Sequence, residues 1–247
     1  MWTLFHKLGS PPYFYGFAGK LIPWLGWICA GLLVAGLYGG LVLAPPDYQQ
    51  GDSYRIIFIH VPSAWMSLFI YVVMAVSGAV GLVWRIKVAE AVAAASAPVG
   101  AWFTFLALIT GSLWGKPMWG TYWVWDARLT SELILLFLYL GVIGLHSAIE
   151  DRRTASRATA VLSLVGLVNI PIIHYSVEWW NTLHQGATIT KIGAPSIHLS
   201  MLMPLLIMAL GFKLYYFMVL LMRSRVEVLE RERGSAWVRE VVRAASA

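Results

Sequence analysis

The sequence predicts an all-α membrane protein with six transmembrane helices. Of its 247 residues, 59% are hydrophobic and only 12% are charged, and the mean hydropathy is +0.70. A soluble domain carries roughly 25% charged residues. Apolar runs of about 20 residues, the length that spans a bilayer core, recur along the whole chain. We therefore expect one polytopic membrane domain rather than a soluble domain with an anchor.

Six apolar segments are each long enough, at 1.5 Å per residue, to cross a hydrocarbon core of about 30 Å. In chain order they cover about 21–43, 57–84, 91–113, 129–148, 158–177 and 199–222. The segments between them contain turn-forming residues, as at Pro45-Pro46-Asp47 and Gly193-Ala194-Pro195. Residues 1–222 are expected to form the membrane domain. The first twenty residues lack an apolar core followed by a small-residue cleavage site, so no removable signal peptide is expected.

Residues 223–247 mix Arg and Glu with Val and Leu at helical spacing, which predicts a cytoplasmic helical tail. A solvated or headgroup-facing helix is the simpler interpretation of this tail. A docking surface for a cytoplasmic partner is the alternative.

The distribution of basic residues predicts the orientation. Thirteen lie in segments on one side: Lys7, Lys20, Arg85, Lys87, Arg152, Arg153, Arg157, Arg223, Arg225, Arg231, Arg233, Arg239 and Arg243. Four lie on the other: Arg55, Lys116, Arg128 and Lys191. Because cytoplasmic segments are enriched in Lys and Arg, we expect both termini in the cytoplasm and three loops outside. The eighteenth basic residue, Lys213, lies within the last span and can snorkel.

Composition also excludes two classes of function. The net charge of +6 follows from membrane topology, so no nucleic-acid partner is expected. Cys29 is the only cysteine and lies in an apolar run, where it is expected to pack as a small residue. One cysteine cannot form an intrachain disulfide or a Cys-x-x-Cys motif, so thiol-redox chemistry is excluded.

The stretch W-G-T-Y-W-V-W-D-A-R-L-T, residues 119–130, combines aromatic rings with an Asp and an Arg. Four of the thirteen tryptophans lie in the second outer loop, about 112–128: Trp114, Trp119, Trp123 and Trp125. An interfacial aromatic belt is the ordinary explanation of such residues. Their density between two spans predicts an aromatic shelf in the plane of the interface. If 119–126 is helical, Trp119 and Trp123 share one face.

Six histidines are present: His6, His60, His146, His174, His184 and His198. His60 lies near the outer end of the second span and His184 just beyond the fifth. Their spacing matches no zinc motif, but two isolated histidines suit the two axial positions of a haem. A local hydrogen bond for each ring is the alternative. His174 and His198 are structural or second-choice ligands, and His6 and His146 are expected to be ordinary residues of the cytoplasmic side.

Haem carries two propionates, and Arg55, Arg128 and Lys116 are the outer cations that could bind them. An Asp126–Arg128 ion pair that braces the loop is the alternative for Arg128. Two other classes of protein fit less well. A cytochrome b-like electron carrier needs facing histidines within the spans, where only His60 and His174 lie near the outer side. A solute permease would have Lys213 alone to mark its route.

The run W-G-K-P-M-W-G-T-Y-W-V-W-D-A-R-L-T-S-E-L, residues 114–133, resembles the tryptophan-rich WWD signature of proteins that handle haem in cytochrome c biogenesis. The flanking segments Y-R-I-I-F-I-H-V-P-S-A-W and I-I-H-Y-S-V-E-W-W-N-T-L-H-Q-G resemble the histidine-bearing segments around that signature. With six spans and cytoplasmic termini, the chain resembles the CcmC family from residue 1 to about 222. Nothing in it resembles a nucleotide-binding P-loop.

The resemblance implies a bis-histidine haem b site formed by His60 and His184 in the bacterial inner membrane, on its periplasmic side. Trp114, Trp119, Trp123, Trp125 and Asp126 would present the haem to the membrane-tethered haem chaperone CcmE. The implied partners are an ABC-type transporter, made of the ATPase CcmA and the membrane subunit CcmB, and the small membrane protein CcmD, with which the chain would form one complex. We expect a haem platform and not an enzyme. The alternative is a haem lyase or synthase component that acts directly on apocytochrome.

Overall fold

The computed structural model describes residue 7, residues 9–186 and residues 194–245, and the regular elements there are all helices. His6 and Lys191 lie outside the described residues. Six described segments are long and apolar enough to span a membrane: Pro11–Leu43, Asp52–Trp84, Lys87–Trp119, Ala127–Ala148, Arg152–Trp179 and Leu199–Arg231. The predicted all-α, six-span class is confirmed.

Several helices are longer than the apolar runs that predict them, whereas the predicted run 57–84 is matched by one helix. In order they are α2 (Pro11–Tyr38) with a π-helical turn (Gly39–Leu43), a 3-10 turn (Asp52–Ile56), α3 (Ile57–Trp84), α4 (Lys87–Trp119), α5 (Ala127–Ala148), α6 (Arg152–Gly166), α7 (Asn169–Trp179), α8 (Leu199–Arg231) and α9 (Ala236–Ala245). The first helix starts at Pro11 rather than near residue 21, because proline fits the first helical turn. Hydropathy marks only the apolar part of a helix. The backbone hydrogen bonds that define the helix continue into the polar residues at its ends.

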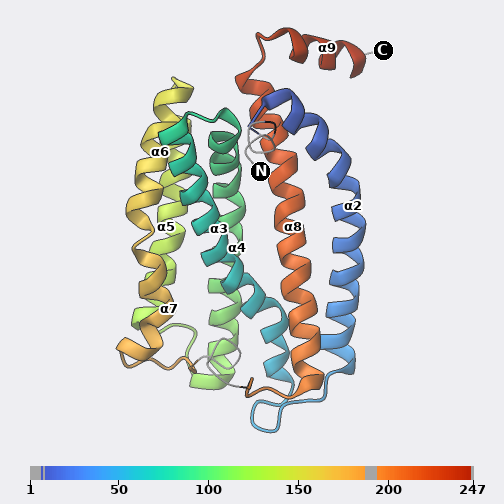
Figure 1. Ribbon diagram of the computed structural model, residues 1–247. Helices are drawn as coiled ribbons and strands as arrows, with labels where there is room; N and C mark the ends of the chain where they lie inside the picture. The colour runs from blue at the N-terminus through green and yellow to red at the C-terminus, as the bar shows by residue number, and fades with distance from the viewer. Residues whose placement is uncertain (1–6, 8, 187–193, 246–247) are drawn as a thin grey trace.

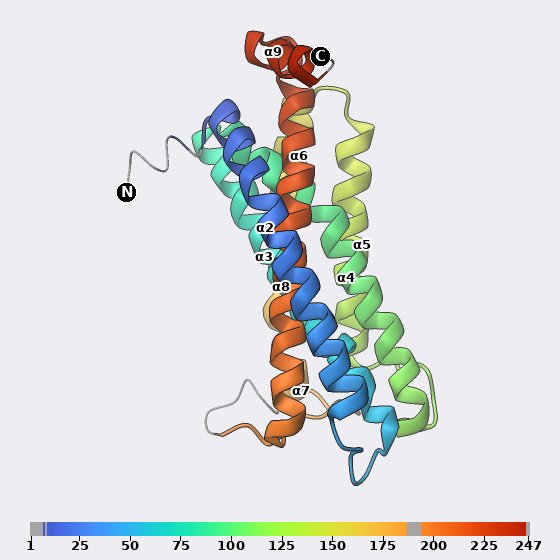
Figure 2. The same ribbon diagram turned by 90° about the vertical axis from the view of Figure 1, so that its right-hand side faces the viewer.

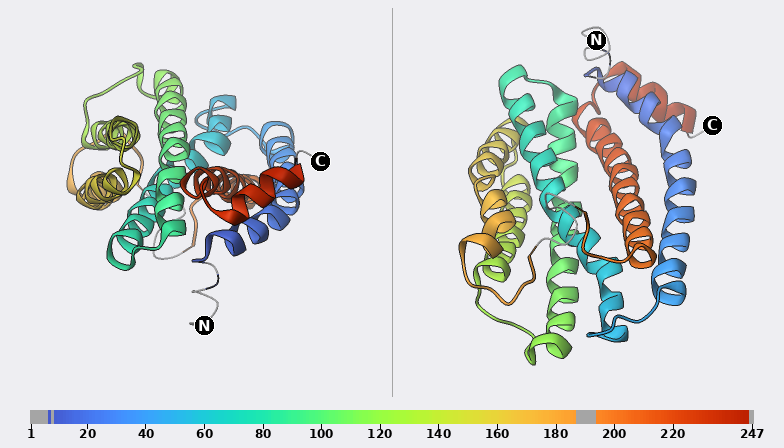
Figure 3. Two further views of the ribbon diagram at one scale, coloured as in Figure 1. Left: turned by 90° about the horizontal axis from the view of Figure 1, so that it is seen from above. Right: turned by 60° about the horizontal axis from the view of Figure 1, so that its bottom comes forward.

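The helices form a central pair with one group on each side. α3 packs along α4 in the middle, α2 packs along α8 on one side, and α5 packs against α6 on the other (Figure 3, left). α2 begins and α9 ends at the same end of the bundle, which we call the terminal end (Figures 1 and 2). There the rings of Tyr15 and Trp237 lie 5.8 Å apart. The opposite end, with α7 and the tryptophan segment, is the loop end.

Three tyrosines occupy the centre of the bundle and are fully buried: Tyr71, Tyr139 and Tyr216. The Tyr139 hydroxyl donates to the Ser67 carbonyl on α3 over 2.8 Å. The Tyr216 hydroxyl lies 2.9 Å from the Ser96 hydroxyl on α4. Since a polar group in a membrane interior must find its partner inside the protein, these bonds link α5 and α8 to the central pair.

The fifth span is two helices and not one. α6 ends at Gly166 and α7 begins at Asn169, whose side-chain amide donates to the Ser131 carbonyl of α5 over 2.9 Å. This bond satisfies a carbonyl and anchors α7 at the loop end, where α7 leads toward His184. At the other end of the chain, α8 continues to Arg231, and a turn that contains Gly234 separates it from α9.

Candidate functional site

The tryptophan segment is partly helix and partly loop. α4 continues to Trp119 and ends at Gly120, which has φ +76°, a left-handed value that glycine adopts at little cost. Residues 120–126 are not helical, so the predicted shared helical face of Trp119 and Trp123 is wrong. Trp114 and Trp119 lie on the last turns of α4, and Trp123 and Trp125 lie on the loop that leads to α5. The predicted outer loop of 112–128 is therefore shortened.

His60 is held against α4 by its Nδ1 atom. That nitrogen lies 3.1 Å from the Ala107 carbonyl oxygen and 3.1 Å from Thr110 Oγ1. A carbonyl only accepts, so this contact places the proton on Nδ1 and leaves Nε2 with a lone pair. A Cβ atom at Gly111 would lie 2.9 Å from His60 Cε1, so glycine allows the ring to pack this closely. The edge of Trp114 completes the contact, with ring centroids 5.6 Å apart.

His184, also at the loop end, is likewise held by its Nδ1 atom. Its Nδ1 lies 3.4 Å from Asp126 Oδ2, and its backbone N–H donates to Thr182 Oγ1 over 3.1 Å. The ionised carboxylate can only accept a hydrogen bond, so the proton lies on Nδ1 and Nε2 again keeps its lone pair. The Trp119 ring lies 4.9 Å from the imidazole, centroid to centroid.

Asp126 joins the tryptophan loop, α5 and the His184 segment. Its side chain is only 6% exposed, and its Oδ1 accepts the Leu129 N–H of the first turn of α5 over 2.8 Å. Its Oδ2 accepts a hydrogen bond from the Thr182 hydroxyl. Burial raises the pKa of Asp126, but the hydrogen bonds from Thr182 and Leu129 and the nearby His184 outweigh it and leave the pKa below its ordinary value.

The alternative that Asp126 pairs with Arg128 is wrong. Asp126 pairs with His184, and the Arg128 guanidinium donates to the Ile173 carbonyl of α7 over 3.3 Å. Arg128 nevertheless acts on the site through its charge. Burial first and the Arg128 cation second lower the pKa of His184, although Asp126 opposes them. The imidazole is therefore held in the neutral form that binds metals.

The other candidate cations are already engaged. Arg55 donates to Asp52 Oδ1 and to the Gly40 carbonyl, each over 2.8 Å. Lys116 donates to the Gly120 carbonyl over 3.0 Å, where it helps to close the end of α4. Arg128, with one long hydrogen bond, is therefore the cation most available to a ligand carboxylate among the three predicted.

The tryptophans differ in their surroundings. Trp114 Nε1 donates to Gln50 Oε1 over 3.0 Å, which ties α4 to the first loop of the loop end. Trp123 Nε1 is buried and has no hydrogen-bond partner among the described residues. Its ring packs edge-on against Trp125, which is 75% exposed. An unpartnered buried indole N–H fits a site that a polar group of a ligand completes.

Trp114 and Trp119 bring the two predicted histidines to one region. They are five residues apart on α4, roughly 7.5 Å along its axis, and each contacts one of the two imidazoles. The second-choice histidines lie elsewhere: His174 is exposed and stacks edge-on against Tyr175, and His198 caps α8. Sequence reasoning missed Thr110, Gly111, Thr182 and Gln50. Nothing in their local pattern distinguishes them, because their partners are distant in sequence.

The groups gathered here could hold a haem. Among the described residues, no three His, Cys, Asp or Glu side chains gather as a metal cluster. A haem iron needs only axial ligands from the protein, because the porphyrin fills its other positions. Two neutral imidazoles with Nε2 lone pairs, aromatic walls and the Arg128 cation are the groups that such a ligand requires.

Comparison with known proteins identifies relatives along nearly the whole chain. The family model described as "Heme exporter protein C" matches residues 4–239. The "Heme exporter protein C" of Escherichia coli (strain K12) is 54% identical over 242 residues, which cover 98% of each chain. That of Haemophilus influenzae is 50% identical over 239 residues, which cover 97% of each chain. That of Paracoccus denitrificans is 41% identical over 235 residues, 95% of this chain and 97% of the relative. The chain therefore belongs to the Heme exporter protein C family, CcmC.

Proposed function

We propose that this chain holds haem b at the periplasmic face of the bacterial inner membrane, between His60 and His184, and delivers it to the haem chaperone CcmE. The observation that carries the proposal is the matched engagement of the two imidazoles. Each uses Nδ1 for a hydrogen bond within the protein, to the Ala107 carbonyl or to Asp126, and each keeps Nε2 for a ligand. Hydrogen bonds of this kind orient metal-binding histidines in proteins.

The tryptophans would bury the apolar faces of the porphyrin. Trp114 and Trp119 already contact the two imidazoles, so a ring ligated by both histidines would lie against the last turns of α4. The exposed Trp125 would leave one edge open to a second protein. The chain itself would bind, orient and protect the haem without acting as an enzyme. Two axial histidines would also close both open iron positions to oxygen.

The partners are inferred from the family. A "Heme exporter protein C", as its relatives are named, fits a transport complex, and we infer that CcmA, CcmB and CcmD form it with this chain. ATP would be used by the CcmA subunit. The terminal end, which the Lys and Arg bias predicts to be cytoplasmic, would face that ATPase, and the loop end would face the chaperone.

The ligation is tested by spectroscopy of the purified chain. The wild-type protein should show six-coordinate low-spin haem, and His60→Ala and His184→Ala should each convert or remove that spectrum. His198→Ala is the matched control, because its Nδ1 accepts the Ser200 N–H at the start of α8 and the residue is exposed. Unchanged low-spin spectra in both site variants would refute the assignment.

Delivery is tested by co-expression. Covalent haem should appear on CcmE only when this chain is present, and should disappear with His60→Ala or His184→Ala. Haem that reaches apocytochrome directly, in cells without CcmE, would favour the lyase or synthase alternative. A reversible redox cycle with no transfer to either acceptor would favour a cytochrome b-like carrier.

A further inference from the structure

Glu132 is a buried acid in the second turn of α5, and it takes no part in the contacts that hold His60 or His184. It is 8% exposed and lies within the fourth span. Its Oε1 lies 2.7 Å from the Ser67 hydroxyl of α3, and this is its only hydrogen bond among the described residues. Acids inside a membrane span are costly, so those that are present usually serve a function.

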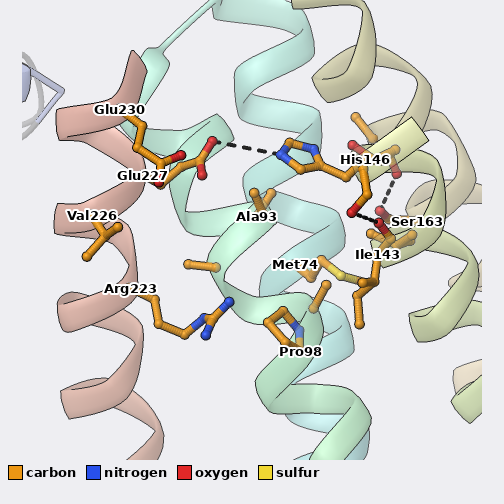
Figure 4. Close-up of a pocket in the computed structure, with 17 residues that line it drawn as sticks. Met74, Ala93, Pro98, Ile143, His146, Ser163, Arg223, Val226, Glu227 and Glu230 are labelled. Atoms are coloured by element: carbon orange, nitrogen blue, oxygen red, sulfur yellow. Dashed lines mark hydrogen bonds and ion pairs between the residues drawn. The ribbon is translucent and has the colours of Figure 1, made fainter. Parts of the chain in front are cut away.

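The acids at the terminal end, by contrast, have direct basic partners. Glu227 lines a cavity of about 320 Å³ between α4, α5, α6 and α8, into which Arg223 also extends (Figure 4). Its Oε1 lies 2.7 Å from Arg231 Nε and 3.8 Å from His146 Nε2. Glu227 is therefore satisfied within its own network. Glu132 has no such partner among the described residues, and its negative charge is available to act on a neighbour.

That neighbour is Arg128, four residues earlier on the same helix. Residues at this spacing lie on one face of a helix, one turn apart. Among the acids of the described residues, Glu132 is the one whose charge acts most strongly on Arg128, ahead of Asp126. The Arg128 guanidinium itself has one long hydrogen bond, 3.3 Å to the Ile173 carbonyl. Neither member of this pair has another charged partner that would take it away.

The pair keeps the guanidinium beside the two imidazoles. A long basic side chain near the end of a span can otherwise turn toward headgroups and water. Burial disfavours a charge on Glu132, whereas the Ser67 hydroxyl and the Arg128 cation favour it. Since a buried charge without a counter-charge is costly, the carboxylate attracts the guanidinium inward. The charge of Arg128 acts on both His60 and His184, so this position lies close to both proposed ligands.

We propose that Glu132 is a positioning residue for recognition of the haem carboxylates. Anchored by Ser67, it holds Arg128 in the place where the guanidinium meets a propionate. The inference rests on the proposed function, since it takes haem as the ligand and Arg128 as the cation that binds it. Glu132 acts through Arg128 and does not touch the haem. Its effect is therefore confined to porphyrins that carry free carboxylates.

The test compares haem with haem dimethyl ester, in which both carboxylates are blocked. Glu132→Gln keeps an oxygen that can accept the Ser67 hydrogen bond but removes the charge. Haem affinity, measured by titration of the purified full-length chain, should fall roughly two- to tenfold, the cost of ordering one long side chain. Affinity for the dimethyl ester should stay at the wild-type value. A loss of packing alone would weaken both ligands equally.

Three further variants complete the test. In an Arg128→Gln background, Glu132→Gln should cause no further loss of haem affinity, because its effect passes through the guanidinium. Ser67→Ala loosens the contact between α3 and α5, and any loss from that cause should affect haem and ester alike. Glu90→Gln is the matched control, since it removes a half-buried acid that pairs with Arg231 at the terminal end. It should leave both affinities unchanged.

The proposal is overturned if Glu132→Gln binds haem with wild-type affinity, or if it weakens haem and the dimethyl ester by the same factor. It is also overturned if the same loss of haem affinity persists in the Arg128→Gln background. Failure of the proposed ligation looks different, because the low-spin spectrum would then survive His60→Ala and His184→Ala whatever the residue at position 132.

Discussion

Replacing Asp126 by asparagine should weaken haem binding with little effect on the fold. In the structure Oδ1 caps α5 through the Leu129 N–H, and Oδ2 receives the Thr182 hydroxyl and lies 3.4 Å from His184 Nδ1. Asparagine can keep its carbonyl oxygen at the cap, where it is as favourable as aspartate. Its NH2 group then takes the place of Oδ2. This donor would face the Thr182 hydroxyl and the His184 Nδ1–H, which are themselves the donors to the Asp126 carboxylate. The imidazole loses the acceptor that orients it.

The size of the effect follows from the role of Asp126 as an orienting partner. Loss of such a hydrogen bond to a metal-binding histidine costs about 10–100-fold in affinity, or about 1.4–2.8 kcal/mol. Asp126→Ala should weaken haem binding similarly and should also lose about 1 kcal/mol of stability with the helix cap. Comparison of the two variants separates orientation of His184 from capping of α5.

The assay is a haem titration followed by Soret absorbance, with thermal unfolding of the haem-free protein measured in parallel. Asp151 provides the matched control, since its exposed carboxylate caps α6 by accepting the Thr154 N–H over 2.8 Å at the terminal end. Asp151→Ala should reduce stability and leave haem affinity unchanged. Wild-type haem affinity in Asp126→Asn, or an equal loss in Asp151→Ala, would refute the reasoning.

Three further predictions concern the same site. Gly111→Ala places a Cβ 2.9 Å from His60 Cε1, so it should displace the imidazole ring. Haem affinity, measured by the same titration, should fall roughly tenfold or more. Full affinity would show that His60 tolerates the shift. Burial and Arg128 hold the pKa of His184 below its ordinary value of about 6.5. The neutral imidazole that ligates iron is therefore fully present above about pH 6.5. Ligation by His184 is lost as the pH falls through the lowered pKa. Arg128→Gln removes the cation and raises this pKa, so the low-spin spectrum should disappear at a higher pH than in the wild type; a midpoint that is unchanged or lower would contradict this. Trp119→Ala removes the ring that contacts His184 and should reduce covalent loading of the chaperone in cells while the protein still inserts; normal loading would leave Trp119 as an interfacial residue only.

Much of the membrane fold could be predicted because its signals are local. A helix that crosses a bilayer must be apolar over roughly 20 consecutive residues, so each span is visible in its own segment. The ends of the helices were less predictable. α4 continues through Gly115 and Pro117 to Trp119, since a helix can extend past the apolar run until a residue such as Gly120 terminates it. The break at residues 167–168 leaves no mark in hydropathy, because both halves of the span are apolar.

The candidate site was predictable in its residue types but not in its connections. Tryptophans and histidines near the ends of spans indicate a haem-like ligand from composition and position. The choice of partner depends on residues that are far apart in the chain, since His60 bonds across 47 positions and His184 across 58. For the same reason the local Asp126–Arg128 pairing, natural from sequence spacing, gave way to Asp126–His184.

The sequence by itself determined the class of this protein, its six spans, its family and the two imidazoles proposed as ligands, because hydropathy, charge bias and motif spacing are all written along one dimension. The tertiary structure decided which nitrogen of each imidazole is held by the protein and which is left for a ligand. It also decided that Asp126 and Thr182 hold His184, and that His146 and Arg223 face one cavity from different helices. These facts depend on how helices pack side by side, and packing brings together side chains whose separation in the chain carries no signal.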